Sequence, residues 1–523
     1  MPRRPRELRS PPGAGEPAGA LPGAVPDSGW PGPLGIGLAL AGYATLHLSA
    51  LGSAPRGISN DAAEEALRGL ILVSERRLEA ITTVLGNSAE TLYLYLAGLL
   101  GTTLGTSWLA LALPSIAAAT ALLGLLVLLS RRLDPRTPAW VPLGLGTASV
   151  WLFHYGQTGL RAVTAPVFLA ATALLVDRSE ESPRAAAGCG AVAGLAVYAY
   201  TSCRVLPIAL FLHFGLRLAL ERRARRAVVR ALLLAAGGLT LVSVPNLLTL
   251  AAHPREFLAR GAYVLPPSAA VGARNLAATA LLPFRYPDRY RTPVSKDHFF
   301  DGVSATLTGA GLDPVDLPTG LAFLAGLVLV RSLRRPLAAF LVLSLGSAVV
   351  LLGSSGPSLT RLLLVLPVYL AFASAAWTAF AARSAVAARV GAVALVALVA
   401  VRARAYATAV PGSEAERLYL SPAVTAVGRE ARTLVREGRR VLCVVTNGRS
   451  TVRYLAAPPG TTAPVVVVEF WGRPPNPAEI PVSEFRPDVL LIERDPRFAG
   501  LAERLGRAAR TDRREHFDVV TVR

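Results

Sequence analysis

The sequence predicts a mainly α-helical protein that crosses a membrane many times and ends in a small α/β domain. Of its 523 residues, 52% are hydrophobic and only 17% are charged, whereas soluble domains carry about 25% charged residues. Apolar segments recur between about residues 33 and 401, and arginines cluster at their ends. A soluble protein could not bury this much apolar surface, so the membrane class is favoured.

The formal net charge is +20. Such basicity can indicate nucleic-acid binding, but here the arginines flank apolar segments, which is typical of membrane topology and of contact with anionic lipid. We therefore expect the lipid bilayer as a partner and no nucleic acid. Cys189, Cys203 and Cys443 lack metal-ligand spacing and the six histidines are scattered. The sequence predicts no disulfide framework, no structural metal and no resident cofactor, and it is compatible with a divalent metal.

Residues 1–32 are basic and then rich in Pro, Gly and Ala, which predicts a disordered cytoplasmic tail. The first apolar segment, at about 33–52, is followed by small residues that resemble a signal-peptide cleavage site. Its distance from the N-terminus favours an uncleaved anchor.

Ten more spans are expected, which gives about eleven within a transmembrane domain of residues 33–410. Several are short for a core of about 30 Å, so their boundaries are soft. They lie near 106–130, 138–153, 160–176, 185–200, 205–220, 227–252, 318–330, 337–352, 362–380 and 390–401.

The arginine-rich loops each lie an even number of spans from the basic N-terminus. The positive-inside rule therefore predicts a cytoplasmic N-terminus and an extracytoplasmic C-terminal region. The abundance of Ala, Gly, Pro and Val suggests a high-GC bacterial genome, and hence a multi-pass protein of the bacterial cytoplasmic (inner) membrane. The opposite loops, of which 53–105 and 253–317 are long, would form the outer face, where long loops are often functional.

The outer loop 53–105 contains two helical patterns, Ala62 to Leu78 and Glu90 to Leu100, that predict amphipathic helices in the membrane interface. Residues 411–523 differ in character and predict a small extracytoplasmic α/β domain. Its expected strands are 441–445, 464–470, 488–492 and 517–522, its expected helices are 422–437 and 498–508, and Thr446-Asn447-Gly448 is expected to form a plain turn.

Three carboxylates follow the first span: Asp61, Glu64 and Glu65. The simplest interpretation is a solvated helix start, because acidic residues are favoured near a helix N-terminus. The functional interpretation is a general base at the membrane surface, with Asp61 taking a proton from an acceptor hydroxyl and Glu64 or Glu65 sharing the task.

Three arginines depart from the positive-inside pattern because they stand at expected outer ends of spans: Arg161, Arg204 and Arg361. Cations on this side suggest an anionic ligand, and a guanidinium can hold a phosphate by paired hydrogen bonds. Near them stand His154, Tyr198 and Tyr200, which are candidates for substrate binding or simple interfacial anchors. The charged and aromatic stretches 253–260 and 285–290 are equally compatible with a sugar site and with a structured loop.

Together these segments resemble the polytopic GT-C glycosyltransferases related to protein O-mannosyltransferases and to the aminoarabinose transferase of lipid A. The resemblance covers roughly residues 35–380 and depends on the order of several weak motifs. Asp61 matches the acidic residue of the family's first outer loop, although Ala62 stands where the family usually has Glu. The other matching segments are Glu90 to Tyr95, Leu113-Pro114-Ser115, Gly159 to Ala162 and Tyr198 to Arg204.

The resemblance implies an enzyme that uses a polyprenyl-phosphate sugar as donor. An acceptor hydroxyl of a lipid, polysaccharide or protein would attack the anomeric carbon at the outer face with inversion, and polyprenyl phosphate would leave. The resemblance also adds Glu90 and Tyr93 to the candidate substrate-binding residues. In physical terms, Arg161, Arg204 and Arg361 would stabilise the anionic leaving group and Asp61 would act as the base.

Two other classes remain open. A transporter or flippase of lipid-linked saccharides would show internal repeats and polar residues at mid-membrane, whereas here the polar residues gather at span ends. A non-catalytic membrane assembly protein would leave Asp61 and the outer arginines without a function.

Overall fold

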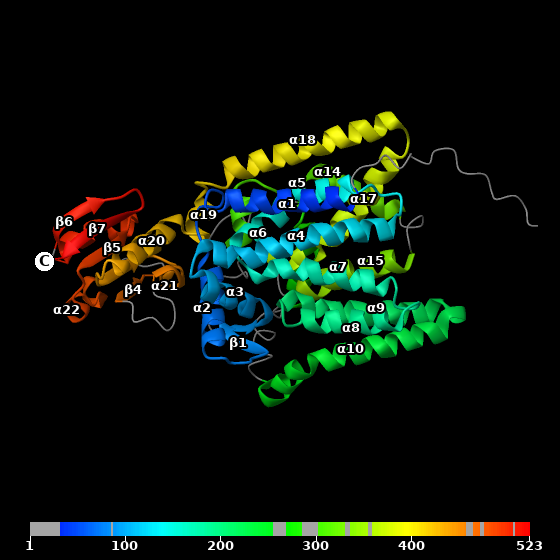
Figure 1. Cartoon of the computed structure of the whole chain (residues 1–523), viewed down its shortest axis with the longest axis horizontal. Coiled ribbons are helices and arrows are strands. Elements are labelled where there is room, and N and C mark those ends of the chain that lie inside the picture. Colours follow the sequence, from blue (N-terminus) through cyan, green and yellow to red (C-terminus); the bar gives the residue numbers. More distant parts are fainter. Residues whose placement is uncertain are drawn as a thin grey trace, which may run out of the picture.

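The computed structural model describes residues 32–84, 87–254, 268–284, 302–329, 335–353, 358–456, 464–470, 475–505 and 508–522. The expected N-terminal tail and the stretches 255–260 and 285–290 lie outside these residues. Figure 1 shows a long helical bundle with a small sheet-containing domain at one end.

Seven helices within the described residues are long and apolar enough to cross a membrane. They are α1 (Pro33–Ala50), α4 (Trp108–Leu133), α9 (Val205–Leu220) with its first turn η2 (Thr201–Arg204), α10 (Arg225–Ala252), α15 (Arg335–Gly353), α17 (Leu366–Ala381) with its preceding turns α16 (Leu359–Leu362) and η6 (Leu363–Val365), and α18 (Ala385–Ala409).

The four other expected spans are also helical, but shorter. They are the pair α5 (Trp140–Ala148) and α6 (Val150–Thr158), then α7 (Thr164–Val176) with its first turn η1 (Arg161–Val163), α8 (Pro183–Ala196) and α14 (Leu317–Val328). The break between α5 and α6 falls at Ser149, whose hydroxyl accepts a hydrogen bond of 3.2 Å from the Leu152 amide and so starts α6. The predicted mainly α-helical, polytopic fold class is confirmed.

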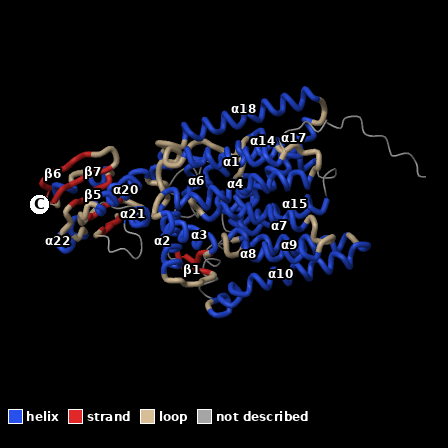
Figure 2. Tube along the Cα trace, in the orientation of Figure 1, coloured by secondary structure: helices blue, strands red, loops and turns tan. Residues whose placement is uncertain are grey.

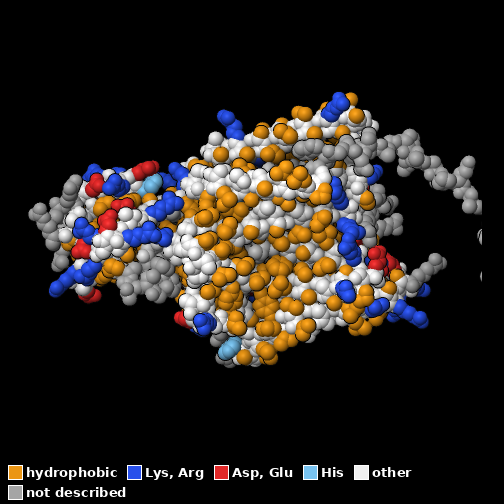
Figure 3. Space-filling model, viewed as in Figure 1, with side chains coloured by type: hydrophobic (Ala, Val, Ile, Leu, Met, Phe, Trp, Pro, Cys, Tyr) orange, Lys and Arg blue, Asp and Glu red, His pale blue; other side chains and the backbone are white. Residues whose placement is uncertain are grey.

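The outermost helices of the bundle present apolar side chains outward. In α10 and α18 only 17% and 11% of the most apolar window is buried within the protein, which is expected of helices that face lipid rather than a protein core. Figure 3 shows hydrophobic side chains spread over the length of the bundle, with arginines gathered at the end away from the C-terminal domain.

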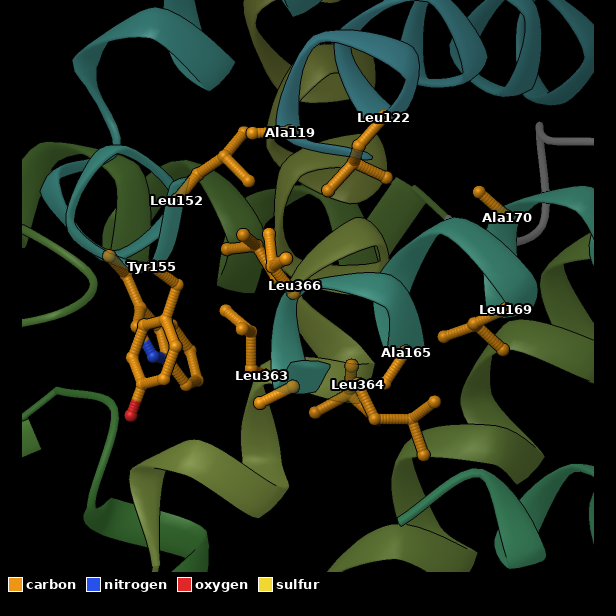
Figure 4. Packing of buried hydrophobic residues seen from close by; sticks show 14 of the residues in the cluster. Ala119, Leu122, Leu152, Tyr155, Ala165, Leu169, Ala170, Leu363, Leu364 and Leu366 are labelled. Atoms are coloured by element: carbon orange, nitrogen blue, oxygen red, sulfur yellow. The ribbon is translucent and has the colours of Figure 1, made fainter. Parts of the chain in front are cut away.

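The bundle interior is packed by α4, α6, α7 and the segment that leads into α17. Leu122 of α4, Leu152 of α6 and Leu169 of α7 surround Leu363 and neighbouring leucines of η6 (Figure 4), and all are almost fully buried. This core fixes the ends of η1, η6 and α6 relative to one another, and these ends carry several of the candidate site residues.

The loop 53–105, which was expected at the outer face, folds into α2 (Asn60–Ser74), a hairpin of β1 (Ile81–Val84) and β2 (Asn87–Glu90), and α3 (Leu92–Leu104). The helices α2 and α3 pack with their backbones in contact, since a Cβ on Gly69 would meet the Leu94 carbonyl oxygen at 2.1 Å and one on Gly98 would meet the Gly69 carbonyl oxygen at 2.2 Å. The sequence predicted both helices but not the hairpin, and α2 ends at Ser74 rather than near Leu78.

The second long loop, 253–317, contains α12 (Ala269–Leu281) and α13 (Gly302–Gly309) among its described residues. At the opposite end of the bundle, the short turn η3 (Arg222–Ala224) joins α9 to α10.

After α18, α19 (Glu414–Tyr419) leads into the C-terminal domain, whose five-stranded sheet has the order β4-β3-β5-β7-β6. The strands β3 (Val441–Val445), β4 (Val465–Glu469) and β5 (Val489–Glu493) are parallel, and β6 (Ala508–Arg513) and β7 (Phe517–Val522) are antiparallel additions. One face packs on α20 (Pro422–Arg436) and α21 (Arg449–Ala456), and the other on short segments. These segments are η7 (Pro477–Glu479), α22 (Val482–Phe485), η8 (Pro496–Phe498) and α23 (Leu501–Arg504). Figure 2 shows this sheet and the β1–β2 hairpin as the strand-containing regions drawn.

One local prediction in this domain was wrong, and one helix was not predicted. The helix expected over 498–508 is limited to α23, and β6 begins shortly afterwards, because its backbone pairs with β7 although its side chains show no apolar alternation. The turn at Thr446-Asn447-Gly448 leads into the unpredicted helix α21. The amides of Gly448 and Arg449 donate hydrogen bonds of 2.6 and 3.2 Å to Glu469, so the chain's own carboxylate occupies this helix start.

The C-terminal domain is docked on the segment that precedes α2. The Arg56 guanidinium binds the buried Glu416 carboxylate at 3.0 Å, and the Ile58 amide donates a hydrogen bond of 2.9 Å to the Thr425 hydroxyl. Gly57 lies so close to the Leu420 carbonyl that a Cβ would meet the oxygen at 1.9 Å. These contacts fix where α2 begins.

Candidate functional site

Asp61 stands in the first turn of α2. The Ser59 hydroxyl caps this helix by accepting a hydrogen bond of 3.1 Å from the Ala62 amide. Asp61 is exposed, whereas Glu65, one turn later on the same side of the helix, is buried. The predicted pair of carboxylates therefore divides into an accessible group and an enclosed group.

Glu65 forms a buried ion pair with Arg161 of η1. The Arg161 Nε lies 3.0 Å from Glu65 Oε1, and the Arg161 amide donates to Oε2 at 3.4 Å. Burial raises the pKa of Glu65 to about 7; the neighbouring Asp61 and Glu90 carboxylates act in the same direction, and Arg161 opposes them. Glu65 therefore gives up its proton at a higher pH than an ordinary carboxyl group does.

Glu90, at the end of β2, is bracketed by two arginines. Its Oε1 lies 3.2 Å from Arg204 Nη2 and accepts a hydrogen bond of 2.8 Å from the Thr201 hydroxyl, while its Oε2 lies 3.5 Å from Arg161 Nη1. Although burial alone would raise it, the pKa of Glu90 is lowered by Arg161, Arg204 and the Thr201 hydrogen bond. The result is a row of alternating charges, Glu65, Arg161, Glu90 and Arg204, which we call the charge row.

The two arginines of the charge row differ in exposure. The Arg161 side chain is 6% exposed and contacts two carboxylates, and Tyr200 covers it with its ring centroid 5.6 Å from the guanidinium carbon. The Arg204 side chain is 35% exposed. Of these two guanidinium groups, that of Arg204 is the one accessible to a ligand.

Arg161, Arg204 and Arg361 each stand in a short helical turn that opens a longer run, in η1, η2 and α16. The turn η1 packs against η6, and α16 packs against η2, so the three turns meet at one place. Arg361 is buried, and Ser358 caps its turn, since the Ser358 hydroxyl accepts a hydrogen bond of 3.3 Å from the Arg361 amide. Helix starts carry partial positive charge, which adds to the guanidinium groups and favours an anion.

Glu64 lies on a different side of α2 from the charge row. Its carboxylate accepts a hydrogen bond of 2.5 Å from the Ser450 hydroxyl of α21, and the Ser450 amide donates a hydrogen bond of 3.1 Å to the side chain of Asn60. Both contacts join the start of α2 to the C-terminal domain. Glu64 is thus placed at the domain interface.

The other predicted substrate-binding residues are engaged within the protein. His154 is fully buried, with its Nδ1 2.8 Å from the Tyr406 hydroxyl, and Tyr93 is buried, with its hydroxyl 2.6 Å from that of Ser115.

Tyr198 bonds to the backbone of α10. Its hydroxyl donates to the Val242 carbonyl at 2.8 Å and accepts from the Asn246 amide at 3.2 Å. It therefore sits between two backbone groups one helical turn apart, beside Pro245, which cannot donate a helical hydrogen bond.

Two contributors were not identified from the sequence. Thr201 donates to Glu90, and the Tyr155 hydroxyl bonds to the hydroxyl of Thr360, the neighbour of Arg361. Each stands next to a predicted residue in the sequence, and this adjacency is the one signal that pointed to them. Figure 4 shows the Tyr155 ring against the core with its hydroxyl directed away from it.

Among the described residues, no group of three or more His, Cys, Asp or Glu side chains is arranged to hold a metal ion. The described part of the site consists of carboxylates, guanidinium groups and helix starts.

No protein-family model and no curated protein matches the chain. Several solved structures resemble it in fold. ArnT from Cupriavidus metallidurans in the apo state matches with a TM-score of 0.58 and 11% identity over 93% of this chain and 97% of that chain. The same protein bound to undecaprenyl phosphate matches with a TM-score of 0.54 and 12% identity, over 94% of this chain and 98% of that chain.

The archaeal oligosaccharyltransferase AglB from Archaeoglobus fulgidus, in complex with an inhibitory peptide and a dolichol-phosphate, matches with a TM-score of 0.53 and 10% identity. This match covers 89% of this chain and 70% of that chain. At such low identity the likeness concerns the fold. The chain has the fold of the GT-C membrane glycosyltransferases.

Proposed function

We propose that the protein is a membrane glycosyltransferase that moves a sugar from a polyprenyl-phosphate donor to an acceptor hydroxyl. The observation that carries this proposal is the placement of Asp61, exposed at the start of α2, close enough to Glu65 and Arg161 to act on both electrostatically. An accessible carboxylate beside a cluster of arginines supplies the base and the cations that such a transfer needs.

In the proposed reaction, the Asp61 carboxylate takes the proton of the acceptor hydroxyl. The hydroxyl oxygen then bonds to the anomeric carbon, and the bond from that carbon to the phosphate oxygen breaks with inversion. Polyprenyl phosphate leaves with the electron pair. The phosphate gains negative charge in the transition state, so fixed cations lower the barrier more than they stabilise the bound donor.

Arg204 is the proposed main phosphate contact, because its side chain is partly exposed at the end of η2. Arg361, which is buried in the turn α16 beside η2, is proposed to add positive charge to the phosphate site. Arg161 is proposed to act on the phosphate without touching it, because its buried positive charge adds to the electrostatic potential there. It also holds the Glu65 and Glu90 side chains in place. Glu90 in turn orients Arg204 and limits its side-chain freedom, which is a form of preorganisation.

The solved structures of similar fold support a lipid-phosphate donor. One holds undecaprenyl phosphate and another holds a dolichol-phosphate together with a peptide. The proposed acceptor is a hydroxyl of a lipid, polysaccharide or protein at the outer face of a bacterial cytoplasmic membrane. In this orientation the arginine-rich end of the bundle faces the cytoplasm, and α2 and the C-terminal domain face outward.

The direct test is to incubate the purified protein with a panel of radiolabelled polyprenyl-phosphate sugars and a membrane extract as the source of acceptor. We expect one sugar to be transferred, with stoichiometric release of polyprenyl phosphate. A protein that moves lipid-linked sugars across proteoliposomes without breaking the phosphate–sugar bond would be a flippase, and this outcome would refute the proposal.

A further inference from the structure

A cavity of about 990 Å³ lies at the end of the bundle opposite the C-terminal domain, where α8 begins and α10 follows η3. It is open to the surroundings, and it is separate from the charge row, which contains residues of α2, β2, η1 and η2. Six of its lining residues carry the argument: Arg222, Arg225, Arg226, Arg230, Val229 and Leu233.

The four arginines of this cavity have no carboxylate partner among the described residues. Other arginines at the same end do: Arg217 pairs with Glu180 at 2.5 Å, and Arg136 pairs with Asp134 at 2.9 Å. The cavity therefore concentrates positive charge, and the start of α10 adds the positive end of a 28-residue helix.

Along α10, the arginines of the cavity are followed by apolar side chains. Leu233, which is 66% exposed, follows Arg226 by two turns and Arg230 by one turn of α10. Residues three or four positions apart share a face of a helix, so one surface of α10 passes from guanidinium groups to hydrocarbon in the direction of the membrane interior. This order of chemistry matches a phospholipid, with its phosphate first and its acyl chains below.

We infer that this cavity binds the headgroup of an anionic phospholipid, with the phosphodiester held by the arginines and an acyl chain lying along Leu233. Basic pockets between transmembrane helices are a recognised setting for anionic headgroups, and each basic residue near a charged membrane surface strengthens binding. The inference concerns the opposite end of the molecule from the proposed transferase site and does not depend on it.

The test compares two charge-matched double variants by native mass spectrometry of the full-length protein in detergent. Arg226→Gln/Arg230→Gln removes two cavity arginines. Arg383→Gln/Arg389→Gln removes two exposed arginines from the α17–α18 connection and the first turns of α18, at the same end of the bundle and outside the cavity. The probes are phosphatidylglycerol, phosphatidylethanolamine, undecaprenyl phosphate and inorganic phosphate.

We expect the wild type and the Arg383/Arg389 variant to retain phosphatidylglycerol at least about tenfold more than phosphatidylethanolamine. The Arg226/Arg230 variant should lose this preference by on the order of tenfold or more. Equal retention of both phospholipids by the wild type would overturn the inference, as would equal losses in the two variants. Preferential binding of undecaprenyl phosphate, or displacement by inorganic phosphate at equal concentration, would overturn it by assigning the cavity to a different ligand.

A second measurement needs no variant. Phosphatidylglycerol should raise the melting temperature of the wild type more than phosphatidylethanolamine does, and the difference should shrink as NaCl rises from low to high concentration, because salt screens exposed charges. A salt-independent difference would contradict recognition by these exposed arginines.

Discussion

The Arg204 guanidinium lies 3.2 Å from the Glu90 carboxylate, and this pair joins the end of the β1–β2 hairpin to the start of α9. Glu90 is almost completely buried, whereas the Arg204 side chain remains about one-third exposed. A carboxylate anchored in the protein therefore orients a cation that still reaches the surface. The proposed phosphate contact depends on this ion pair, and substitutions of either residue test it.

Glu90→Gln should destabilise the protein strongly. The substitution leaves the buried Arg161 without one of its two carboxylates, and removing one partner of a buried ion pair costs about 3–5 kcal/mol. The measurement is thermal unfolding in detergent. Glu75→Gln, at an exposed pair with Arg77 just past the end of α2, is the control and should change stability by less than about 0.5 kcal/mol. Equal stability of the two variants would show that Glu90 is not an electrostatic anchor.

Asp61→Asn should lower the transfer rate by roughly 10²–10⁴-fold without a change in melting temperature, because the amide cannot take the acceptor proton. The assay is release of polyprenyl phosphate from the active donor. Glu64→Gln provides a comparison on the same turn of α2, where the carboxylate bonds to Ser450 instead of facing the charge row. A larger loss of rate in Glu64→Gln than in Asp61→Asn would move the base to Glu64.

Arg204→Ala should lower kcat/KM for the donor by about 10²–10³-fold, because it removes a fixed cation from the developing phosphate charge. Arg204→Lys should recover part of the loss, since a lysine keeps the charge but loses the planar geometry. Arg77→Ala, which removes an exposed arginine near the β1–β2 hairpin, is the control. Unchanged donor kinetics in Arg204→Ala would remove this residue from the site.

The apparent KM for the donor should rise as pH increases through about 7, because Glu65 then ionises and offsets the charge of Arg161. The expected increase is roughly threefold to tenfold, and Glu65→Gln should flatten the profile. The same shift affects stability. The folded-state pKa lies above the unfolded value of about 4.5, so the contribution of Glu65 to the free energy of unfolding falls as pH rises from about 4.5 to about 7. If the KM for the donor depends on pH in the same way in the wild type and in Glu65→Gln, then Glu65 is not the source of that pH dependence.

Gly69→Ala should disrupt the packing of α2 on α3, because the added Cβ would meet the Leu94 carbonyl oxygen at 2.1 Å and the helices would have to separate. We expect a loss of roughly 1–3 kcal/mol in unfolding experiments, together with reduced transfer as α2 shifts. Gly37→Ala in α1 is the control, since a Cβ there would meet no atom within 4 Å. An unchanged free energy of unfolding in Gly69→Ala would indicate that α2 and α3 can move apart at little cost.

Sequence patterns predicted the helical segments well, because what makes a segment a membrane-spanning helix lies within that segment. A span needs a run of apolar residues, and the eleven expected segments are all helical. The same patterns failed for β6 and for the β1–β2 hairpin. The strand β6 forms because β7 offers a partner edge, and its own residues carry no apolar alternation that would have revealed it.

In the candidate site, too, the sequence identified individual residues, whereas the contacts between distant residues came from the structure. Arg161, Arg204 and Arg361 were selected because they depart from the positive-inside pattern, and the structure brings their helical turns together. Sequence could not show that Glu65 and Glu90 share Arg161, since these residues are distant along the chain and their pairing depends on how α2, β2 and η1 meet. Nor could it separate Glu64 from Glu65, which are adjacent in sequence but point to the C-terminal domain and to the charge row respectively.

The sequence by itself determined that this chain forms a many-helix membrane bundle with an α/β appendage, because hydrophobic length and strand periodicity are properties of short segments. Only the tertiary structure decided that Arg204 remains accessible while Arg161 is enclosed by two carboxylates. Burial and ion pairing are properties of the assembled neighbourhood, since they depend on which distant segments exclude water from a side chain.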